Sequence, residues 1–195
     1  MRHSIGYLGI ITGILLLAGS ARGDEPSLQV GDLVPEFHGI DDRGQAWNSR
    51  DHVGQRVQVI YFYPSDFSFC CTRQAERYRD CRLNLAGMEV DVIGVSGDSV
   101  EAHHMFQTTH KLGFRLLSDG DGQMARRFGV PLRVGGKAVV PLAGGGVGEF
   151  QRDFTAARWT FVVGKEGRIL YRETSVSPAR DSQEVLDFLC NLGSE

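Results

Sequence analysis

Two adjacent cysteines, Cys70 and Cys71, stand in the stretch DFSFCCTRQ, directly after an apolar segment. A cysteine attacks as its thiolate, and at a free pKa of about 8.5 only ~3% of a thiol is ionised at pH 7. A helix N-terminus, a nearby cation and hydrogen-bond donors each favour the thiolate. Cys71 falls in the first turn of a predicted helix, and Ser68 is placed as its N-cap or as a donor to the sulfur. The spacing makes Cys71 a candidate nucleophile.

The elements that must position these cysteines have clear patterns. Residues 57–63, VQVIYFY, form a continuous apolar run that predicts a buried central strand, ended by Pro64. Over residues 69–86, apolar side chains recur at helical spacing, which predicts a helix that Gly87 stops. The predicted strand and helix therefore meet beside the two cysteines.

The rest of the chain alternates between strand and helix patterns. We expect strands at 88–97 and 114–119, helices at 99–113, 122–130 and 182–190, and a hairpin over 158–174. This order predicts an α/β, thioredoxin-like fold, with a mixed central sheet flanked by helices on both faces. Residues 131–157 are glycine-rich and weakly periodic, so we expect a long loop with at most a short strand at 137–140.

Residues 1–23 differ in composition from the rest of the chain. Arg2, an apolar run over residues 5–18 and small residues from Gly19 onward have the layout of a secretory signal peptide. Because a membrane span needs about 20 apolar residues, we expect cleavage, with an uncleaved membrane anchor as the alternative. Ser20 stands where a lipidated cysteine would be, so we expect no lipid. The sequence predicts a signal peptide over 1–23, one domain over 24–195, and export to the periplasm.

Charge and cysteine count narrow the functional classes. The chain has 21 basic and 24 acidic residues, and Arg2 and Arg22 lie in the predicted signal, which leaves 19 against 24. The sequence has no basic tract for binding nucleic acid. Four cysteines are too few for a disulfide scaffold, although an exported protein is allowed to form disulfides. Redox chemistry is the remaining interpretation of these cysteines.

Several motifs resemble one family. YFYPSDFSFCCTRQ matches the peroxiredoxin pattern P-x-x-x-[T/S]-x-x-C, with Pro64, Ser68 and Cys71 in register. Residues 30–47 resemble the opening strands of the family, and residues 92–130 resemble its bacterioferritin-comigratory (Q-type) branch. Arg158 matches the family's late arginine before a strand. The chain therefore resembles the peroxiredoxins of the alkyl hydroperoxide reductase/thiol-specific antioxidant superfamily.

This resemblance implies a thiol-dependent peroxidase. Cys71 would reduce hydrogen peroxide and organic hydroperoxides, become a sulfenic acid, and be reduced again by thioredoxin or another thiol. Ser68 would hydrogen-bond the sulfur and the peroxide, Arg158 would stabilise the thiolate and the departing oxygen, and Pro64 would shield the pocket. Gln74 stands where the family usually has glutamate, which implies a weaker contact to the arginine. The resemblance implies no cofactor and no metal, and a monomer or homodimer.

The sequence leaves open which group resolves the sulfenic acid. The Q-type branch often has a resolving cysteine five residues after the peroxidatic one, where this chain has Glu76. Cys81 is the candidate resolving cysteine, but it lies about 15 Å along an intact helix, and a disulfide needs Cα atoms within about 7 Å. Its spacing favours a core residue, as does that of Cys190, and Cys70 is expected to fill space beside Cys71. An external thiol is the alternative.

Two other functions compete with a peroxidase. An exported thioredoxin-like thiol–disulfide oxidoreductase would need a C-x-x-C pair, which this sequence does not have. A metal-carrying module on the same fold is the other alternative, but adjacent cysteines suit a shared metal poorly. His103, His104 and His110 share one predicted helix, and because that helix looks polar we expect solvent-exposed histidines and no metal site.

Overall fold

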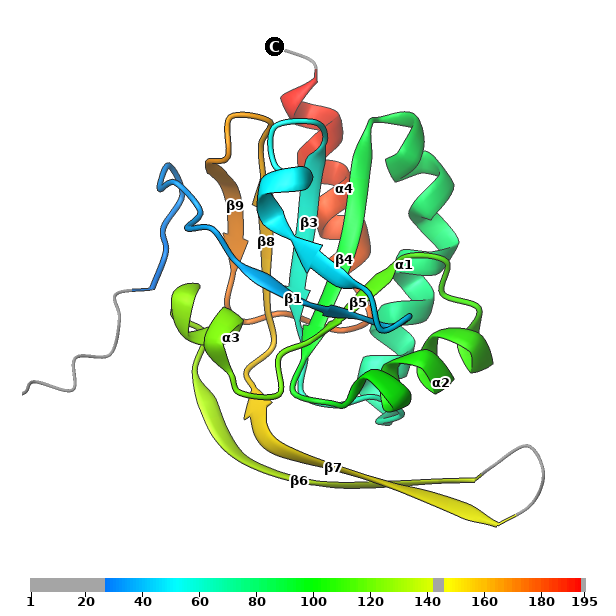
Figure 1. Cartoon of the computed structure of the whole chain (residues 1–195). Helices are drawn as coiled ribbons and strands as arrows, with labels where there is room; N and C mark the ends of the chain where they lie inside the picture. The colour runs from blue at the N-terminus through cyan, green and yellow to red at the C-terminus, as the bar shows by residue number, and fades with distance from the viewer. Residues whose placement is uncertain (1–26, 142–145, 194–195) are drawn as a thin grey trace, which may run out of the picture.

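The computed structural model describes residues 27–141 and 146–193 of the chain. Its centre is a seven-stranded sheet with the strand order β2-β1-β5-β4-β3-β8-β9 (Figure 1). The strands of this sheet are β1 (His38–Asp41), β2 (Ala46–Asn48), β3 (Val57–Phe62), β4 (Val90–Ser96), β5 (Arg115–Ser118), β8 (Trp159–Val163) and β9 (Ile169–Glu173). The helices are α1 (Phe69–Gly87), α2 (Val100–His110), α3 (Gln123–Arg127) and α4 (Asp181–Leu192), with a 3₁₀ turn η1 (Ser49–Asp51).

The sheet is mixed because of how its central strand β3 is paired. β3 runs parallel to β4 on one side and antiparallel to β8 on the other. Four consecutive residues of β3, from Val59 to Phe62, are completely buried. A strand covered on both faces reads as a continuous apolar run, which explains the pattern of VQVIYFY. The predicted α/β, thioredoxin-like architecture is confirmed.

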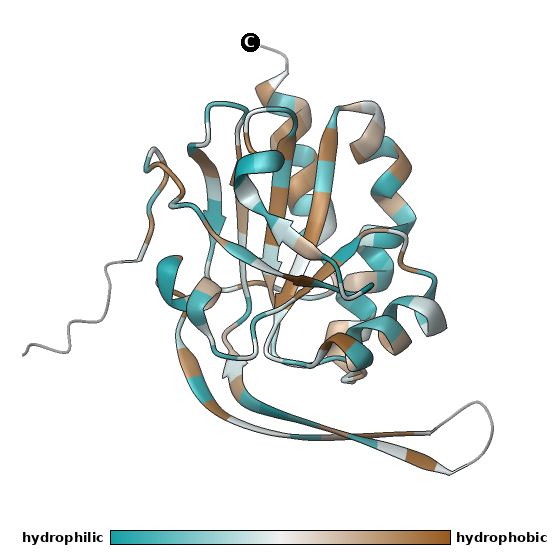
Figure 2. Cartoon of the chain, viewed as in Figure 1, coloured by the Kyte–Doolittle hydropathy of each residue, from teal (hydrophilic) through white to brown (hydrophobic). Residues whose placement is uncertain are grey.

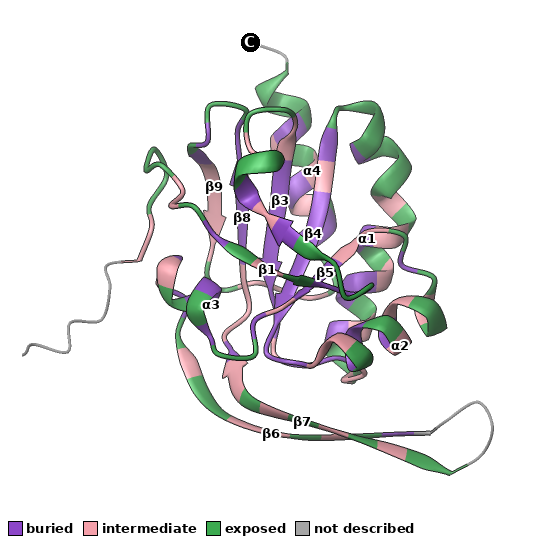
Figure 3. Cartoon of the chain, viewed as in Figure 1, coloured by how far each residue is buried: buried purple, intermediate pink, exposed green. Residues whose placement is uncertain are grey.

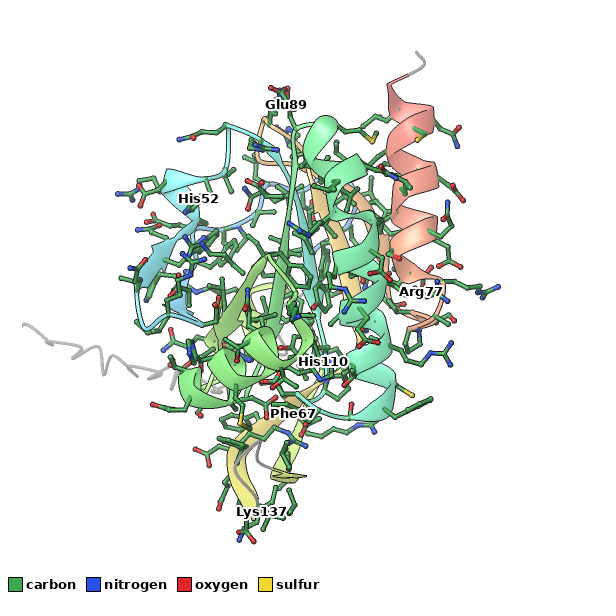
Figure 4. The ribbon with its side chains drawn as sticks, turned by 90° about the vertical axis from the view of Figure 1, so that its right-hand side faces the viewer. His52, Phe67, Arg77, Glu89, His110 and Lys137 are labelled. Atoms are coloured by element: carbon green, nitrogen blue, oxygen red, sulfur yellow. The ribbon has the colours of Figure 1, made fainter. Side chains whose placement is uncertain are left out.

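Each face of the sheet has its own apolar core. Because side chains alternate along a strand, Ile60 and Phe62 enter one cluster while Val59 and Tyr61 enter the other. Residues of α3 pack on the first cluster, and residues of α1, α2 and α4 pack on the second. Figure 3 shows buried residues concentrated in the central strands, and Figure 4 shows α1 and α4 together beside the sheet.

Residues 132–141 and 147–156 pair as the two strands of a long β-hairpin, so the expectation of a long loop over residues 131–157 is wrong. β6 (Leu132–Pro141) and β7 (Val147–Ala156) pair antiparallel and extend beyond the body of the molecule (Figure 1). Hydrophilic and hydrophobic residues both occur along this arm (Figure 2), but they do not alternate strictly, which weakens its strand pattern. Glycine also obscured it: a Cβ at Gly135 would lie 2.0 Å from the carbonyl oxygen of Arg152, so the close strand approach requires glycine.

The predicted signal peptide, residues 1–23, lies outside the described residues. Among the helices of residues 27–141 and 146–193, none is both long and apolar enough to cross a membrane.

Candidate active site

The junction between β3 and α1 positions Cys71. Ser68 is the N-cap of α1, and its Oγ accepts a hydrogen bond from the Cys71 backbone N–H at 3.3 Å. The same hydroxyl donates to the carbonyl oxygen of Ser65 at 3.3 Å. Cys71 therefore lies in the first turn, where the free N–H groups and the positive end of the helix dipole gather. Its side chain is 1% exposed, so a thiolate there is largely shielded from water.

Arg158 reaches this sulfur from the neighbouring strand. Phe62 at the end of β3 pairs with Trp159 at the start of β8, so the residue before β8 lies close to the start of α1. Arg158 Nη2 donates to Cys71 Sγ at 3.1 Å. A guanidinium is always charged and presents its donors in a rigid plane, so this contact favours the thiolate. The structure thus brings Cys71, Ser68 and Arg158 together as predicted, and half-buried Pro64 lies in the same β3–α1 connection.

A second set of hydrogen bonds, which runs through Gln74 to Asp181, holds the guanidinium of Arg158 in place. Arg158 Nη1 donates to Gln74 Oε1, and Gln74 Nε2 donates to Asp181 Oδ2 at 2.6 Å. Tyr78 and Thr160 donate to the same carboxylate oxygen at 2.8 and 3.0 Å. Burial raises the pKa of Asp181, although these hydrogen bonds oppose the change. Gln74 therefore does contact the arginine, through its side-chain oxygen.

A buried polar network supports the loop before α1. Asp66 accepts from Tyr63 Oη at 2.7 Å and pairs with His103 Nδ1 at 2.8 Å, and its backbone N–H donates to Asp98 Oδ2 at 2.9 Å. Burial alone would lower the pKa of His103, but the adjacent carboxylates, Asp66 first, raise it above its ordinary value. The expectation of solvent-exposed histidines is wrong for His103, which is completely buried.

The hairpin arm contacts the same loop. Arg152 of β7 donates to Ser65 Oγ at 3.0 Å and lies 3.6 Å from Asp98. Phe150 stacks near Phe67, with ring centroids 6.4 Å apart. Phe67 has a φ of 56°, a left-handed backbone that is rare for a bulky residue and must be held by its surroundings. The arm therefore helps to fix the loop that caps α1.

Two of the other three cysteines, Cys70 and Cys190, lie at positions that differ from the expectations. Cys70 is exposed, because it lies one helical step from the inward-facing Cys71, so its expected space-filling role is wrong. Cys190 is exposed as well, one step beyond the buried Leu189, so the core interpretation is wrong for it too. Cys81 is half-buried and packs against the second core cluster, where burial raises the pKa of its thiol. α1 is unbroken from Phe69 to Gly87 and carries both Cys71 and Cys81.

Metal binding has no support in the described part of the chain. Within residues 27–141 and 146–193, no group of three or more histidine, cysteine, aspartate or glutamate side chains is arranged to hold a metal ion.

Comparison with known proteins identifies the family. A model of the AhpC/TSA family matches residues 30–172. The chain belongs to this family. It is 29% identical to Peroxiredoxin Bcp of Bacillus subtilis over 171 residues, which cover 87% of this chain and 99% of that protein. It is 42% identical to Peroxiredoxin Bcp of Escherichia coli over 103 residues, which cover 53% and 65% of the two chains.

Solved structures agree with this assignment. Peroxidoxin BcpB of Mycobacterium tuberculosis matches with a TM-score of 0.70 and 25% identity, covering 85% of this chain and 98% of that one. Peroxiredoxin Q of Xanthomonas campestris matches with a TM-score of 0.65 and 27% identity, covering 80% and 90%. The predicted membership of the peroxiredoxins, its Q-type affinity and the enzyme class, a thiol-dependent peroxidase, are confirmed.

Two parts of the site were missed from sequence. Asp181 is at the first position of α4, 107 residues after Gln74, and nothing in the local pattern joins them. The partnership of Asp66 and His103 spans 37 residues and depends on the sheet that brings the loop before α1 close to α2. The only available signal was the spacing of His103 with apolar Phe106, which places both on one helical face.

Proposed function

We propose that the chain reduces hydroperoxides at Cys71, and one observation carries this assignment. The sulfur lies in the first turn of α1 and accepts a hydrogen bond from the Arg158 guanidinium at 3.1 Å. The thiolate attacks the terminal peroxide oxygen, the O–O bond breaks, and the sulfur becomes a sulfenic acid. The departing oxygen takes up a proton and leaves as water or an alcohol.

The neighbouring groups have distinct roles in this step. Arg158 stabilises the thiolate and the negative charge that develops on the departing oxygen. Ser68 fixes the start of the helix by accepting from the Cys71 N–H at 3.3 Å, and because its hydrogen goes to Ser65, its remaining lone pair would accept a hydrogen bond from the peroxide. Pro64 closes one side of the approach to the sulfur. These roles use the geometry of the β3–α1 junction and need no cofactor.

The substrate class follows from the family and from a relative. A solved structure of the bacterioferritin comigratory protein of Xanthomonas campestris, 26% identical to this chain, is described with alkyl peroxide reduction activity. We propose that this chain likewise accepts organic hydroperoxides as well as hydrogen peroxide, in antioxidant defence and redox homeostasis.

An external thiol donor, such as thioredoxin, completes the cycle in this proposal. Its first thiol condenses with the sulfenic acid to give a mixed disulfide and water, and a second thiol then releases Cys71 as a thiol. Cys81 would resolve Cys71 only after α1 unwinds, since ten residues of intact helix separate them by about 15 Å. A monomer or a homodimer is compatible with this route.

The decisive experiment measures peroxide consumption by the reduced protein in the presence of dithiothreitol. We expect Cys71→Ser to abolish it, and Cys70→Ser, the matched neighbouring change, to leave it within about twofold of the wild-type rate. Intact mass after one equivalent of peroxide, with dimedone as a trap, should place one sulfenic acid on Cys71. Unchanged turnover in Cys71→Ser would refute the assignment.

Export is a separate proposal, based on residues 1–23. We propose that this segment directs the chain across the membrane and is then cleaved, which makes the enzyme periplasmic. N-terminal sequencing of the protein from a periplasmic fraction should begin near residue 24. Recovery of the uncleaved chain in the membrane fraction would support the anchor instead.

A further inference from the structure

Asp181 is a buried carboxylate with an uneven set of partners. It begins α4 and is 0% exposed. Gln74, Tyr78 and Thr160 all donate to its Oδ2, at 2.6, 2.8 and 3.0 Å. Its Oδ1 has no hydrogen-bond partner among the described residues. Burying a charge in this way opposes folding, so packing alone does not account for an acid at this position.

Gln74 connects this carboxylate to the reactive centre. It is completely buried, its Oε1 accepts from Arg158, and its Nε2 donates to Asp181. A side-chain amide has one accepting end and one donating end. The carboxylate accepts only, so it fixes the NH₂ end of Gln74 toward α4 and leaves the carbonyl oxygen facing the guanidinium. The reverse orientation would set donor against donor at Arg158.

The guanidinium of Arg158 links the oriented Gln74 amide to the Cys71 sulfur, because it contacts both. Arg158 uses Nη1 for Gln74 and Nη2 for Cys71, and the two nitrogens belong to one rigid plane. We propose that Asp181 is a positioning residue for peroxide reduction, which acts through Gln74 to hold Arg158 against the Cys71 sulfur. The inference rests on the proposed function of Cys71, and it adds a residue that touches neither peroxide nor sulfur.

The direction in which the pH dependence of Cys71 alkylation shifts distinguishes a positioning role of Asp181 from a purely electrostatic effect of its charge. A negative charge near Cys71 opposes ionisation of the thiol, so removing it would move thiolate formation to lower pH. A loosened Arg158 would move thiolate formation to higher pH, because the guanidinium then stabilises the sulfur less. Asp181→Asn keeps the size and one accepting oxygen, but hydrogen bonds to a neutral acceptor are roughly half as strong as those to a carboxylate.

Exchanging the carboxylate and the amide between positions 181 and 74 should restore the oxidation rate that Asp181→Asn loses. In the double variant Gln74→Glu with Asp181→Asn, the carboxylate at position 74 would accept from Arg158 directly and could also accept from the new amide. Gln74→Glu alone would place two carboxylates where the present contact is 2.6 Å, so it should be impaired. The pair therefore forms a double-mutant cycle in which each single change is worse than both together.

The experiment compares six proteins: wild type, Asp181→Asn, Gln74→Glu, the double variant and two controls. Asp187→Asn makes the same chemical change at an exposed position of α4. Gln183→Glu makes the change of Gln74→Glu at another exposed position of α4. The readouts are the second-order rate of Cys71 oxidation by hydrogen peroxide, the pH dependence of Cys71 alkylation by iodoacetamide, and urea unfolding.

We expect Asp181→Asn to slow oxidation about tenfold, to shift alkylation to higher pH, and to leave a folded protein. The double variant should return to within about threefold of wild type, and both controls should stay within about twofold. The inference is overturned if Asp181→Asn matches Asp187→Asn, if alkylation shifts to lower pH, or if the double variant stays as slow as Asp181→Asn. Peroxide reduction by wild type that is lost in Cys71→Ser would leave the proposed function standing in each of these cases.

Discussion

Replacing Arg158 by methionine removes the guanidinium whose Nη2 lies 3.1 Å from Cys71 Sγ. A hydrogen bond to a charged group contributes about 1.5–3 kcal/mol. If about 2 kcal/mol of this acts on the transition state, peroxide oxidation slows roughly 30-fold. Arg158→Lys keeps the charge but cannot contact the sulfur and Gln74 with one planar group. Its oxidation rate should therefore lie between those of wild type and Arg158→Met, about five- to tenfold slower than wild type.

The assay mixes reduced protein with excess hydrogen peroxide, quenches at intervals and measures the dimedone-trapped sulfenic acid by intact mass. Arg172→Met is the matched control, because Arg172 stacks on Trp159 at 4.6 Å and contacts Ser27 and Gln29, away from Cys71. It should oxidise at the wild-type rate. An Arg158→Met rate within twofold of wild type would show that the guanidinium contact does not act in the chemical step.

Three further predictions concern stability. Tyr61→Phe should raise the free energy of unfolding in urea by about 1 kcal/mol, because the buried Tyr61 hydroxyl lacks a hydrogen-bond partner in the described residues; a loss of stability would contradict this. Gly94→Ala should lower it by about 1–3 kcal/mol, since a Cβ would lie 2.8 Å from both the Tyr61 hydroxyl and Leu116, and adding Tyr61→Phe should recover part of the loss. His103→Gln should remove the stabilisation that the ion pair with Asp66 provides. This stabilisation is complete below about pH 6.5 and is lost as pH rises through the raised folded-state pKa of His103. The difference from wild type in the free energy of urea unfolding should therefore shrink toward high pH, and a difference that grows with pH would exclude the ion pair.

The central strand, the helix with the cysteines and the contact of Cys71 with Ser68 and Arg158 could be predicted because their signals are local or motif-based. β3 is an uninterrupted apolar run, and α1 begins where Ser68 can cap it. Arg158 precedes a strand that pairs with β3, so one strand pairing suffices to bring it to Cys71. Few long-range contacts had to be known for this part of the site.

The parts that failed depend on packing between distant segments. The β6–β7 arm has too weak an alternation and too many glycines to be read as strands, and its close approach at Gly135 appears only once both strands are placed. The helix of His103 looks polar from sequence, yet Asp66, in the loop between β3 and α1, pairs with this histidine and makes its burial possible. Asp181 accepts from three partners on two other elements, Gln74 and Tyr78 of α1 and Thr160 of β8, so no local spacing could reveal it.

The continuous helix α1 has a consequence for the lifetime of the oxidised enzyme. All four cysteines lie in the described residues, and Cys81 is held about 15 Å from Cys71 while α1 stays folded. On the proposed route, reduction is then a bimolecular event whose frequency is set by the donor's concentration. A second peroxide competes for the same sulfenic acid and converts it irreversibly to the sulfinic form. The ratio of donor to peroxide in the compartment, and not the fold, decides how many turnovers each molecule completes before it is spent.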